Sequence, residues 1–172
     1  MKNLVRILAM LTLSIGALVA FPGSGSAAGY FDHNVPARIV NLNSSKCLNV
    51  KDWGTTRETP IQQWSCSRDT NNVWKSFEVG PSQYSFFPES ANWCFGTPDS
   101  NPSADGAPIR LEPCGASNNT WSIRPYASGL YQIVNLFSGK CLNVQNWSTA
   151  NGAALVQWTC SGDANNLFYF EP

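Results

Sequence analysis

The stretch of sequence that decides the fold begins with Cys47-Leu48-Asn49-Val50 and ends with Asn71-Asn72-Val73-Trp74. The same frame returns twice, from Cys94 to Trp121 and from Cys141 to Phe168, so both ends recur with a period of 47 residues (94 − 47 = 141 − 94 = 47). A second cysteine lies inside each copy, at positions 66, 114 and 160. Three copies at one spacing indicate a repeat architecture, in which a single repeat cannot bury its apolar face alone.

The N-terminus has the features of a secretory signal peptide. Lys2 and Arg6 give a basic start, residues 7–21 are mostly apolar, and residues 22–28 are rich in small side chains. The apolar run is shorter than the ~20 residues that a membrane span needs. We therefore expect a signal peptide over residues 1–28, a secreted mature chain of residues 29–172 that begins with a short leader arm, and no membrane span.

The composition argues against several classes of protein. Charged residues make up 13% of the chain, against roughly 25% in typical domains. Without Lys2 and Arg6, 11 − 2 = 9 basic residues face 11 acidic ones, so no basic face is available for a nucleic acid. The repeats, at about 35–81, 82–128 and 129–172, fill the mature chain as one domain and leave no room for a separate catalytic domain.

All six cysteines lie in the repeats, two in each. Six cysteines allow 15 pairings, but the repeat symmetry favours Cys47–Cys66, Cys94–Cys114 and Cys141–Cys160. Each disulfide would close a loop of about 20 residues, which contributes roughly 3 kcal/mol in the chain-entropy model. Zinc ligands lie two to four residues apart, and the single histidine, His33, lies outside the repeats, so we predict no metal and no cofactor.

Short runs of β-branched and aromatic residues recur once per repeat, at Ala37–Asn41, Tyr84–Phe87 and Tyr131–Asn135. Asn, Ser, Gly and Pro separate these runs, which is typical of short strands, and no apolar period of a helix is sustained. The sequence therefore predicts an all-β domain with pseudo-threefold symmetry. The residues expected to meet in its core are Leu48, Phe95, Leu142, Trp74, Trp121, Phe168, Val50, Thr97 and Val144.

The three repeats resemble the ricin B-type β-trefoil family in their motifs, which are Cys-Leu-Asn-Val, Gln-x-Trp-x-Cys and a closing Asn-x-Trp. That family includes plant toxin lectin chains and carbohydrate-binding modules of secreted bacterial glycosidases. The resemblance covers residues 35–172 and implies a twelve-stranded β-trefoil with up to three shallow sugar sites, one per repeat.

The resemblance also implies which residues form each site. The family uses an acidic residue two positions after the first cysteine, a Gln and an aromatic platform before the second, and an Asn-Gln pair at the close. In the first repeat these positions hold Asn49, Gln62, Trp64, Asn71 and Asn72. In the third repeat they hold Asn143, Val156, Trp158, Asn165 and Asn166. In the second they hold Gly96, Arg110, Glu112, Asn118 and Asn119.

These residue types suit neutral sugars at two of the three sites. Trp64 and Trp158 offer flat faces on which the apolar side of a pyranose can stack. Asparagine replaces the family's acidic residue, and hydrogen bonds between neutral groups contribute ~0.5–1.5 kcal/mol against ~1.5–3 for charged ones, so we expect weak sites. Glu112 cannot stack on a sugar, which predicts that the middle site does not bind. Trp53 and Trp147 are either a second stacking wall or packing over the disulfide.

The function predicted from these residues is that of a non-catalytic lectin that binds glycans or polysaccharides. The alternative is a protein-interaction trefoil, such as the delivery subunit of a toxin or a protease inhibitor, because the stretch from Cys94 to Asp99 weakly resembles binding subunits of cytolethal distending toxins. We expect no enzyme, because a lone histidine forms no catalytic set and the carboxylates of Asp99, Asp105 and Glu112 are expected to be solvated loop charges rather than a glycosidase pair.

Overall fold

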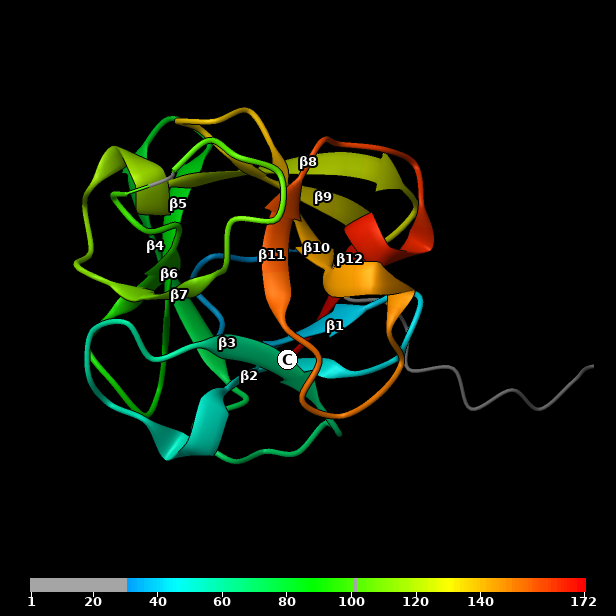
Figure 1. Ribbon diagram of the computed structural model, residues 1–172, viewed down its shortest axis with the longest axis horizontal. Helices are drawn as coiled ribbons and strands as arrows, with labels where there is room; N and C mark the ends of the chain where they lie inside the picture. Colours follow the sequence, from blue (N-terminus) through cyan, green and yellow to red (C-terminus); the bar gives the residue numbers. More distant parts are fainter. Residues whose placement is uncertain (1–30, 101) are drawn as a thin grey trace, which may run out of the picture.

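The computed structural model describes residues 31–100 and 102–172, so the predicted signal peptide lies outside the described residues. Figure 1 shows three lobes arranged around a central axis, which correspond to the three sequence repeats. Within the described ranges the chain forms twelve strands and four short 3-10 turns. The strands are β1 (Arg38–Asn41), β2 (Cys47–Val50), β3 (Ile61–Trp64), β4 (Trp74–Gly80), β5 (Gln83–Pro88), β6 (Cys94–Gly96), β7 (Arg110–Glu112), β8 (Trp121–Ala127), β9 (Leu130–Asn135), β10 (Cys141–Val144), β11 (Leu155–Trp158) and β12 (Phe168–Glu171). The 3-10 turns are η1 (Lys51–Trp53), η2 (Ser117–Asn119), η3 (Gln145–Trp147) and η4 (Ala164–Asn166).

A closed barrel forms one end of the molecule. Antiparallel pairing runs in the order β1-β12-β9-β8-β5-β4. Ala37 and Trp74 then close the ring, because each donates its backbone N–H to the carbonyl oxygen of the other at 2.9 Å. Closure leaves no free sheet edge around the barrel. The all-β prediction and the predicted β-trefoil are therefore confirmed.

Three hairpins cap the other end of the barrel, one from each lobe: β2–β3, β6–β7 and β10–β11. They meet where Ile61 donates its N–H to the carbonyl of Ile109, and Ile109 to that of Leu155, both at 2.9 Å. Each lobe also sends a loop onto its neighbour. Gly152 N–H donates to Gln63 O at 2.9 Å, and Gly106 N–H donates in the same way to Gln157 O at 2.9 Å. A loop of one lobe therefore forms part of the outer face of the neighbouring lobe.

The predicted core is confirmed, because all nine residues named for it are buried. Two of the aromatic residues that end the repeats, Trp74 and Trp121, also make a hydrogen bond in the core. The indole N–H of Trp74 donates to the carbonyl of Leu48, and that of Trp121 donates to the carbonyl of Phe95, both at 3.1 Å. The three predicted disulfides are also present, each with Cα atoms 4.9 Å apart. The core and the disulfides thus follow the repeat symmetry.

The described part of the leader arm packs onto the barrel. The ring of Phe31 lies 4.7 Å from that of Phe170 and 5.0 Å from that of Tyr84, measured between centroids. Its backbone N–H donates to the hydroxyl of Tyr131 at 3.2 Å. The sequence predicts the arm but not this contact, which covers apolar surface at the end of the barrel opposite the hairpins.

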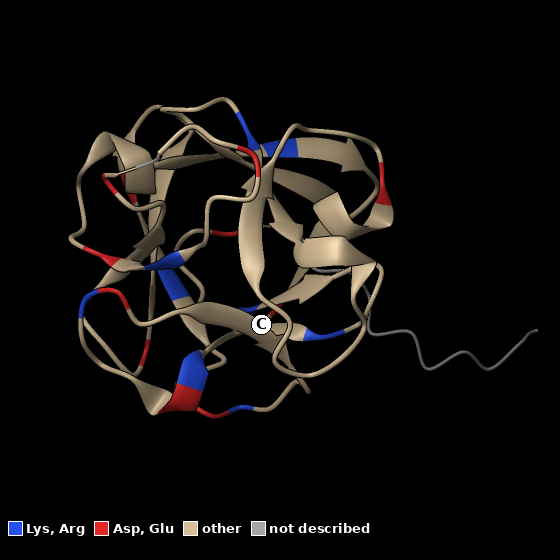
Figure 2. Cartoon of the chain, in the orientation of Figure 1, with Lys and Arg blue, Asp and Glu red and all other residues tan. Residues whose placement is uncertain are grey.

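Charges are sparse and mixed over the described chain. Figure 2 shows Lys and Arg interspersed with Asp and Glu around all three lobes, with no large area of one sign. None of the helices in the described residues has the length and apolar character needed to cross a membrane.

Candidate functional site

The predicted site residues of the first lobe lie together on the outer face of the β2–β3 hairpin. Trp64 ends β3 with 43% of its surface exposed. Asn49 and Gln62 face each other across the hairpin, and the amide of Gln62 donates to Oδ1 of Asn49 at 2.9 Å. This bond occupies the acceptor of Asn49, so its own N–H groups remain for a ligand. We call Asn49, Gln62, Trp64 and Asn71, together with Trp53, which is the repeat equivalent of Trp147, the first-lobe site.

The same face of the third lobe is hollowed into a small concavity. Its volume is about 200 Å³. Trp158, which is 48% exposed and ends β11, and Trp147 both line it. The residues that line it are Asn143, Gln145, Asn146, Trp147, Trp158, Ser161, Asp163, Asn165 and Asn166. Asn143, Trp147, Trp158 and Asn165 form what we call the third-lobe site.

Asn143 is the most informative of these residues. Its side chain is only 5% exposed and lines the concavity. Val156 takes the position that Gln62 holds in the first lobe, so it offers no amide partner. No other described residue hydrogen-bonds to the Asn143 side chain. The N and O atoms of this amide are not among the side-chain atoms shut off from solvent, so both its donor and its acceptor are open to a ligand.

Asn71 and Asn165 are fixed identically in the two lobes. The amide of Asn71 donates to the carbonyl of Val50, and that of Asn165 donates to the carbonyl of Val144, both at 3.2 Å. The donor end of each amide is therefore tied to the strand behind it. Oδ1 of Asn165 is left as an acceptor for a ligand hydroxyl, whereas Oδ1 of Asn71 also accepts a bond from the amide of Asn72 at 3.4 Å.

Asn72 and Asn166, the last of the predicted site residues, are almost fully buried. Oδ1 of Asn166 accepts a bond from the backbone N–H of Ser161 at 3.0 Å. The amide of Asn72 lies 3.4 Å from Oδ1 of its neighbour Asn71. Both side chains therefore support the site from behind, and direct contact with a ligand stays a prediction.

Trp53 and Trp147 are held in a backbone conformation that bulky residues rarely adopt. The φ angles are 50° for Asp52 and 56° for Trp53 in η1, and 54° for Asn146 and 55° for Trp147 in η3. Two successive left-handed residues cost energy, and such strain is concentrated at binding sites. Both indoles are exposed, and Trp147 faces the concavity that Trp158 also lines. Trp147 therefore has the position of a second wall, and for Trp53 both alternatives stay predictions.

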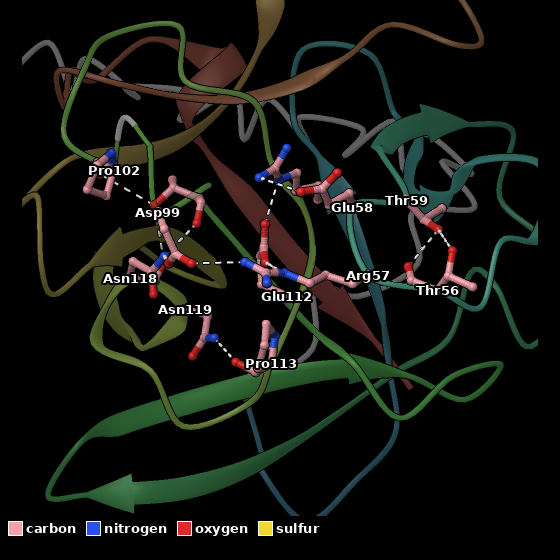
Figure 3. Close-up of polar contacts among 12 residues, drawn as sticks. Thr56, Arg57, Glu58, Thr59, Asp99, Pro102, Glu112, Pro113, Asn118 and Asn119 are labelled. Carbon is pink, nitrogen blue, oxygen red and sulfur yellow. Dashed lines mark hydrogen bonds and ion pairs between the residues drawn. The ribbon is translucent and has the colours of Figure 1, made fainter.

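The middle lobe holds an ion cluster where the other lobes hold a tryptophan platform (Figure 3). Glu112 is 1% exposed, and its carboxylate accepts bonds from Nε of Arg57 at 2.7 Å and from Nε of Arg110 at 2.5 Å. Arg57 also pairs with Asp99 at 2.9 Å, and Asp99 accepts a bond from Asn118 at 3.0 Å. The expectation that Glu112 is a solvated loop charge is therefore wrong, because it is a buried strand residue paired with two guanidinium groups.

At Gly96, the outer face of the middle lobe has no space for a side chain. A Cβ atom at Gly96 would lie 2.4 Å from Cβ of Asn119 and 2.9 Å from its Cα. Such contacts are far shorter than van der Waals distances, so no side chain can take the place of Asn49 or Asn143 here. Arg57, which comes from the first lobe, covers the carboxylate instead.

Two ionisable groups near these faces have shifted pKa values. The carboxylate of Glu112 raises the pKa of Arg57, mainly through their hydrogen bond. Lys140 lowers the pKa of Asp105, assisted by hydrogen bonds from Thr159, the residue after the third-lobe platform. Among the described residues, no group of three or more His, Cys, Asp or Glu is arranged to hold a metal ion.

The fold and these faces define a class: a disulfide-bonded β-trefoil with shallow, tryptophan-walled faces on two of its three lobes. The model of the ricin-type β-trefoil lectin domain matches residues 35–168, and the chain belongs to this family. No sequence among the curated proteins matches the chain.

Solved structures share the fold. ThreeFoil, a designed 3-fold symmetric protein, is 26% identical with a TM-score of 0.77, over 82% of this chain and 99% of its own. An exo-β-1,3-galactanase from Clostridium thermocellum is 24% identical with a TM-score of 0.76, over 83% of this chain and 31% of its own. A ricin B-like lectin of Macrolepiota procera, solved with lactose, is 14% identical with a TM-score of 0.69, over 83% of this chain and 99% of its own. The family supports a carbohydrate-binding role and is generally non-catalytic.

Proposed function

We propose that this protein is a non-catalytic lectin that holds one neutral sugar unit at the third-lobe site and one at the first-lobe site. The observation that carries this proposal is the third-lobe concavity, in which two tryptophans and the unpartnered amide of Asn143 converge. Its volume of about 200 Å³ is below the ~300–1,000 Å³ typical of pockets for drug-sized molecules, so it suits a single ring with the rest of the glycan in solvent.

The chemistry at this face fits a pyranose. The apolar side of the sugar stacks on Trp158, while Trp147 shields a second side from water. The hydroxyls at the ring edge then meet Asn143, which both donates and accepts, and Oδ1 of Asn165, which accepts. Neutral amides avoid the cost of removing a charge from water, and they give modest affinity at each site. Two such sites on one rigid body strengthen binding to a polymer or cell surface, because the second contact is intramolecular.

A glycan array with the mature, oxidised protein tests the proposal. Lactose and β-1,3-galactan oligosaccharides are the first probes, because both contain galactose and the two natural relatives compared above bind or cleave such ligands. We expect binding that free sugar competes, that weakens when either Trp64→Ala or Trp158→Ala is introduced, and that disappears in the double variant. Retention of binding by the double variant would refute the assignment of the sites. Tight copurification with another protein, without any glycan binding, would instead support the protein-interaction alternative.

Secretion is a separate part of the proposal. The basic start and apolar run of residues 1–28 support cleavage after Ala28. N-terminal sequencing of the exported protein is expected to begin at Gly29, and an intact Met1 on exported material would refute it.

A further inference from the structure

We propose that two asparagines of the first lobe, Asn41 and Asn43, position the third-lobe site and make it the stronger of the two sugar sites. This inference rests on the proposed function, because it concerns the relative strength of its two sites. Both residues lie in or just after β1, far in sequence from the third-lobe residues that they contact. Neither touches the concavity itself, so each is a positioning residue.

Asn41 fixes the floor of the third-lobe site. Its side chain is fully buried, and Nδ2 lies 3.2 Å from the carbonyl oxygen of Asn165, 3.3 Å from that of Leu167 and 3.4 Å from that of Ala164. These carbonyls belong to the turn η4 and the residue after it. One amide therefore holds the backbone segment that carries Asn165, whose Oδ1 is aimed at the ligand.

Asn43 fixes the wall of the same site. Its Nδ2 donates to the carbonyl of Trp147 at 3.1 Å. Trp147 follows Asn146, and both have left-handed φ angles, of 55° and 54°. Strained conformations of this kind persist where the surrounding structure holds them in place. The bond from Asn43 does this for the residue that forms the second wall.

The first-lobe site has neither support. The repeat places Pro88 at the position of Asn41 and Ser90 at that of Asn43 (41 + 47 = 88; 43 + 47 = 90). Pro88 has no side-chain donor, and the turn is reached by backbone groups alone: the N–H of Glu89 donates to the carbonyl of Val73 at 2.9 Å and that of Ser90 to the carbonyl of Thr70 at 3.1 Å. No side chain of the described residues donates a hydrogen bond to the carbonyl of Trp53. That residue has the same strained φ, 56°, without the same support.

The middle lobe has a bond like that of Asn41, made by the asparagine at the same position of the repeat. Asn135, one period from Pro88, donates from Nδ2 to the carbonyl of Asn118 at 2.8 Å, in the turn η2. The turns of the second and third lobes are both 3-10 segments, whereas the corresponding residues of the first lobe form simple turns. Asparagine at this position therefore occurs beside a 3-10 turn in two lobes, and the first lobe has neither the asparagine nor the 3-10 turn.

Support of this kind raises affinity because a site that is already ordered loses less freedom on binding. One hydrogen bond to the wall corresponds to about a two- to tenfold difference in the dissociation constant. We therefore expect the third-lobe site to bind tighter than the first-lobe site by about three- to tenfold. Asn43→Ala is the sharper test, because Asn41 is buried and its truncation also lowers stability.

Single-site proteins separate the two sites. Trp64→Ala leaves only the third-lobe site and Trp158→Ala leaves only the first-lobe site, and calorimetric titration with lactose gives the dissociation constant of each. In the Trp64→Ala protein, Asn43→Ala is expected to weaken binding about three- to tenfold with an almost unchanged melting temperature. Ser90→Ala in the Trp158→Ala protein is the matched control and is expected to change nothing. Tighter binding by the Trp158→Ala protein than by the Trp64→Ala protein would overturn the proposal.

A measurement without sugar tests the support directly. Nitrogen-15 NMR relaxation reports the order of the backbone amides of residues Trp147 and Trp53. We expect Trp147 to be the more ordered, and Asn43→Ala to lower its order to that of Trp53. Equal order in the parent, or no change on Asn43→Ala, would overturn the proposal. If no variant binds any glycan, the proposed function fails, and these relaxation data still decide whether the support exists.

Discussion

Trp74 provides a quantitative test of how the core is held together. Its indole is buried, lies edge-on to Phe95 with ring centroids 5.4 Å apart, and donates its N–H to the carbonyl of Leu48 at 3.1 Å. The third lobe has Phe168 at the same position of the repeat, also buried. The frame therefore accepts a phenyl ring at this position, and Trp74→Phe and Trp74→Ala separate two contributions to stability.

The magnitudes follow from these contacts. Trp74→Phe keeps most of the ring but removes the donor to the Leu48 carbonyl, and leaving a buried group without its partner costs about 1–3 kcal/mol. Trp74→Ala removes the ring as well, and truncation of a buried Trp to Ala costs about 3–5 kcal/mol. With a urea dependence of about 1–3 kcal/mol/M, a loss of about 4 kcal/mol lowers the unfolding midpoint by roughly 1.3–4 M.

Urea unfolding of the oxidised protein, followed by circular dichroism, measures both losses. Trp64→Ala is the matched control, because that ring is 43% exposed; its midpoint is expected to stay close to that of the parent while lactose binding falls. Trp74→Phe is expected to show the reverse, with binding retained at low urea. A Trp74→Ala midpoint no lower than that of Trp64→Ala would refute the assignment of Trp74 to the core and of Trp64 to the ligand face.

Three further predictions concern the faces around the platforms. Gly152→Ala is expected to cost about 1–2 kcal/mol because its φ is +84°, while lactose binding stays close to that of the parent, since its Cβ would lie in ordinary van der Waals contact with the first-lobe platform, at 3.8 Å; Gly139→Ala, at φ +68° with open space around it, is expected to lower the melting temperature in the same way. The lowered pKa of Asp105 stabilises the fold above the ordinary pKa of about 3.9 and ceases to do so as pH falls through the lowered value, so the melting temperature of the parent is expected to fall more steeply with acid than that of Asp105→Asn. Glu112→Trp in a protein without Trp platforms in the other lobes is expected to give no lactose retention, because Gly96 leaves no room for a ligand-binding side chain, and retention would refute this.

The sequence predicts those features that repeat with its period. The first cysteines and the core positions recur every 47 residues and the second cysteines within one residue of that period, so the repeat is enough to place the strands, the core and the disulfides. The platform residues Trp64 and Trp158 also lie at repeated offsets, and the structure brings them to equivalent outer faces. Local spacing carries this information because each lobe forms its own hairpin.

Contacts between lobes cannot be predicted in this way. Asn43 reaches Trp147 across 104 residues, and Arg57 reaches Glu112 across 55. Nothing in the local sequence of either partner marks such a pair. The left-handed backbone of Trp147 is hidden for a similar reason, since a tryptophan is among the last residues expected there. A signal was nevertheless present for Glu112: a charged residue at a platform position needs a partner of opposite charge.

The hairpins explain how one lobe can lose its ligand face while the fold persists. Side chains alternate between the two faces of a strand, so Leu48 points into the core while Asn49 points to the site. In the middle lobe the pairing register places Phe95 opposite Leu111 on the core face, and Gly96 opposite Arg110 on the outer face. Substitutions on the outer face therefore leave the shared core intact.

On the outer face of the middle lobe, a buried carboxylate has to be paired with positive charge. Glu112 occupies the repeat position of the platform tryptophans, and its nearly buried carboxylate needs positive partners. Arg110 lies on the same strand, and the loop that carries Arg57 already crosses from the first lobe, where Glu58 donates its N–H to the carbonyl of Leu111 at 2.8 Å. The corresponding loops of the other lobes place Gly152 beside Trp64 and Gly106 beside Trp158. One inter-lobe contact thus lies beside a tryptophan in two lobes and supplies a counter-ion in the third, which is why the outer face of the middle lobe differs although all three lobes share one core.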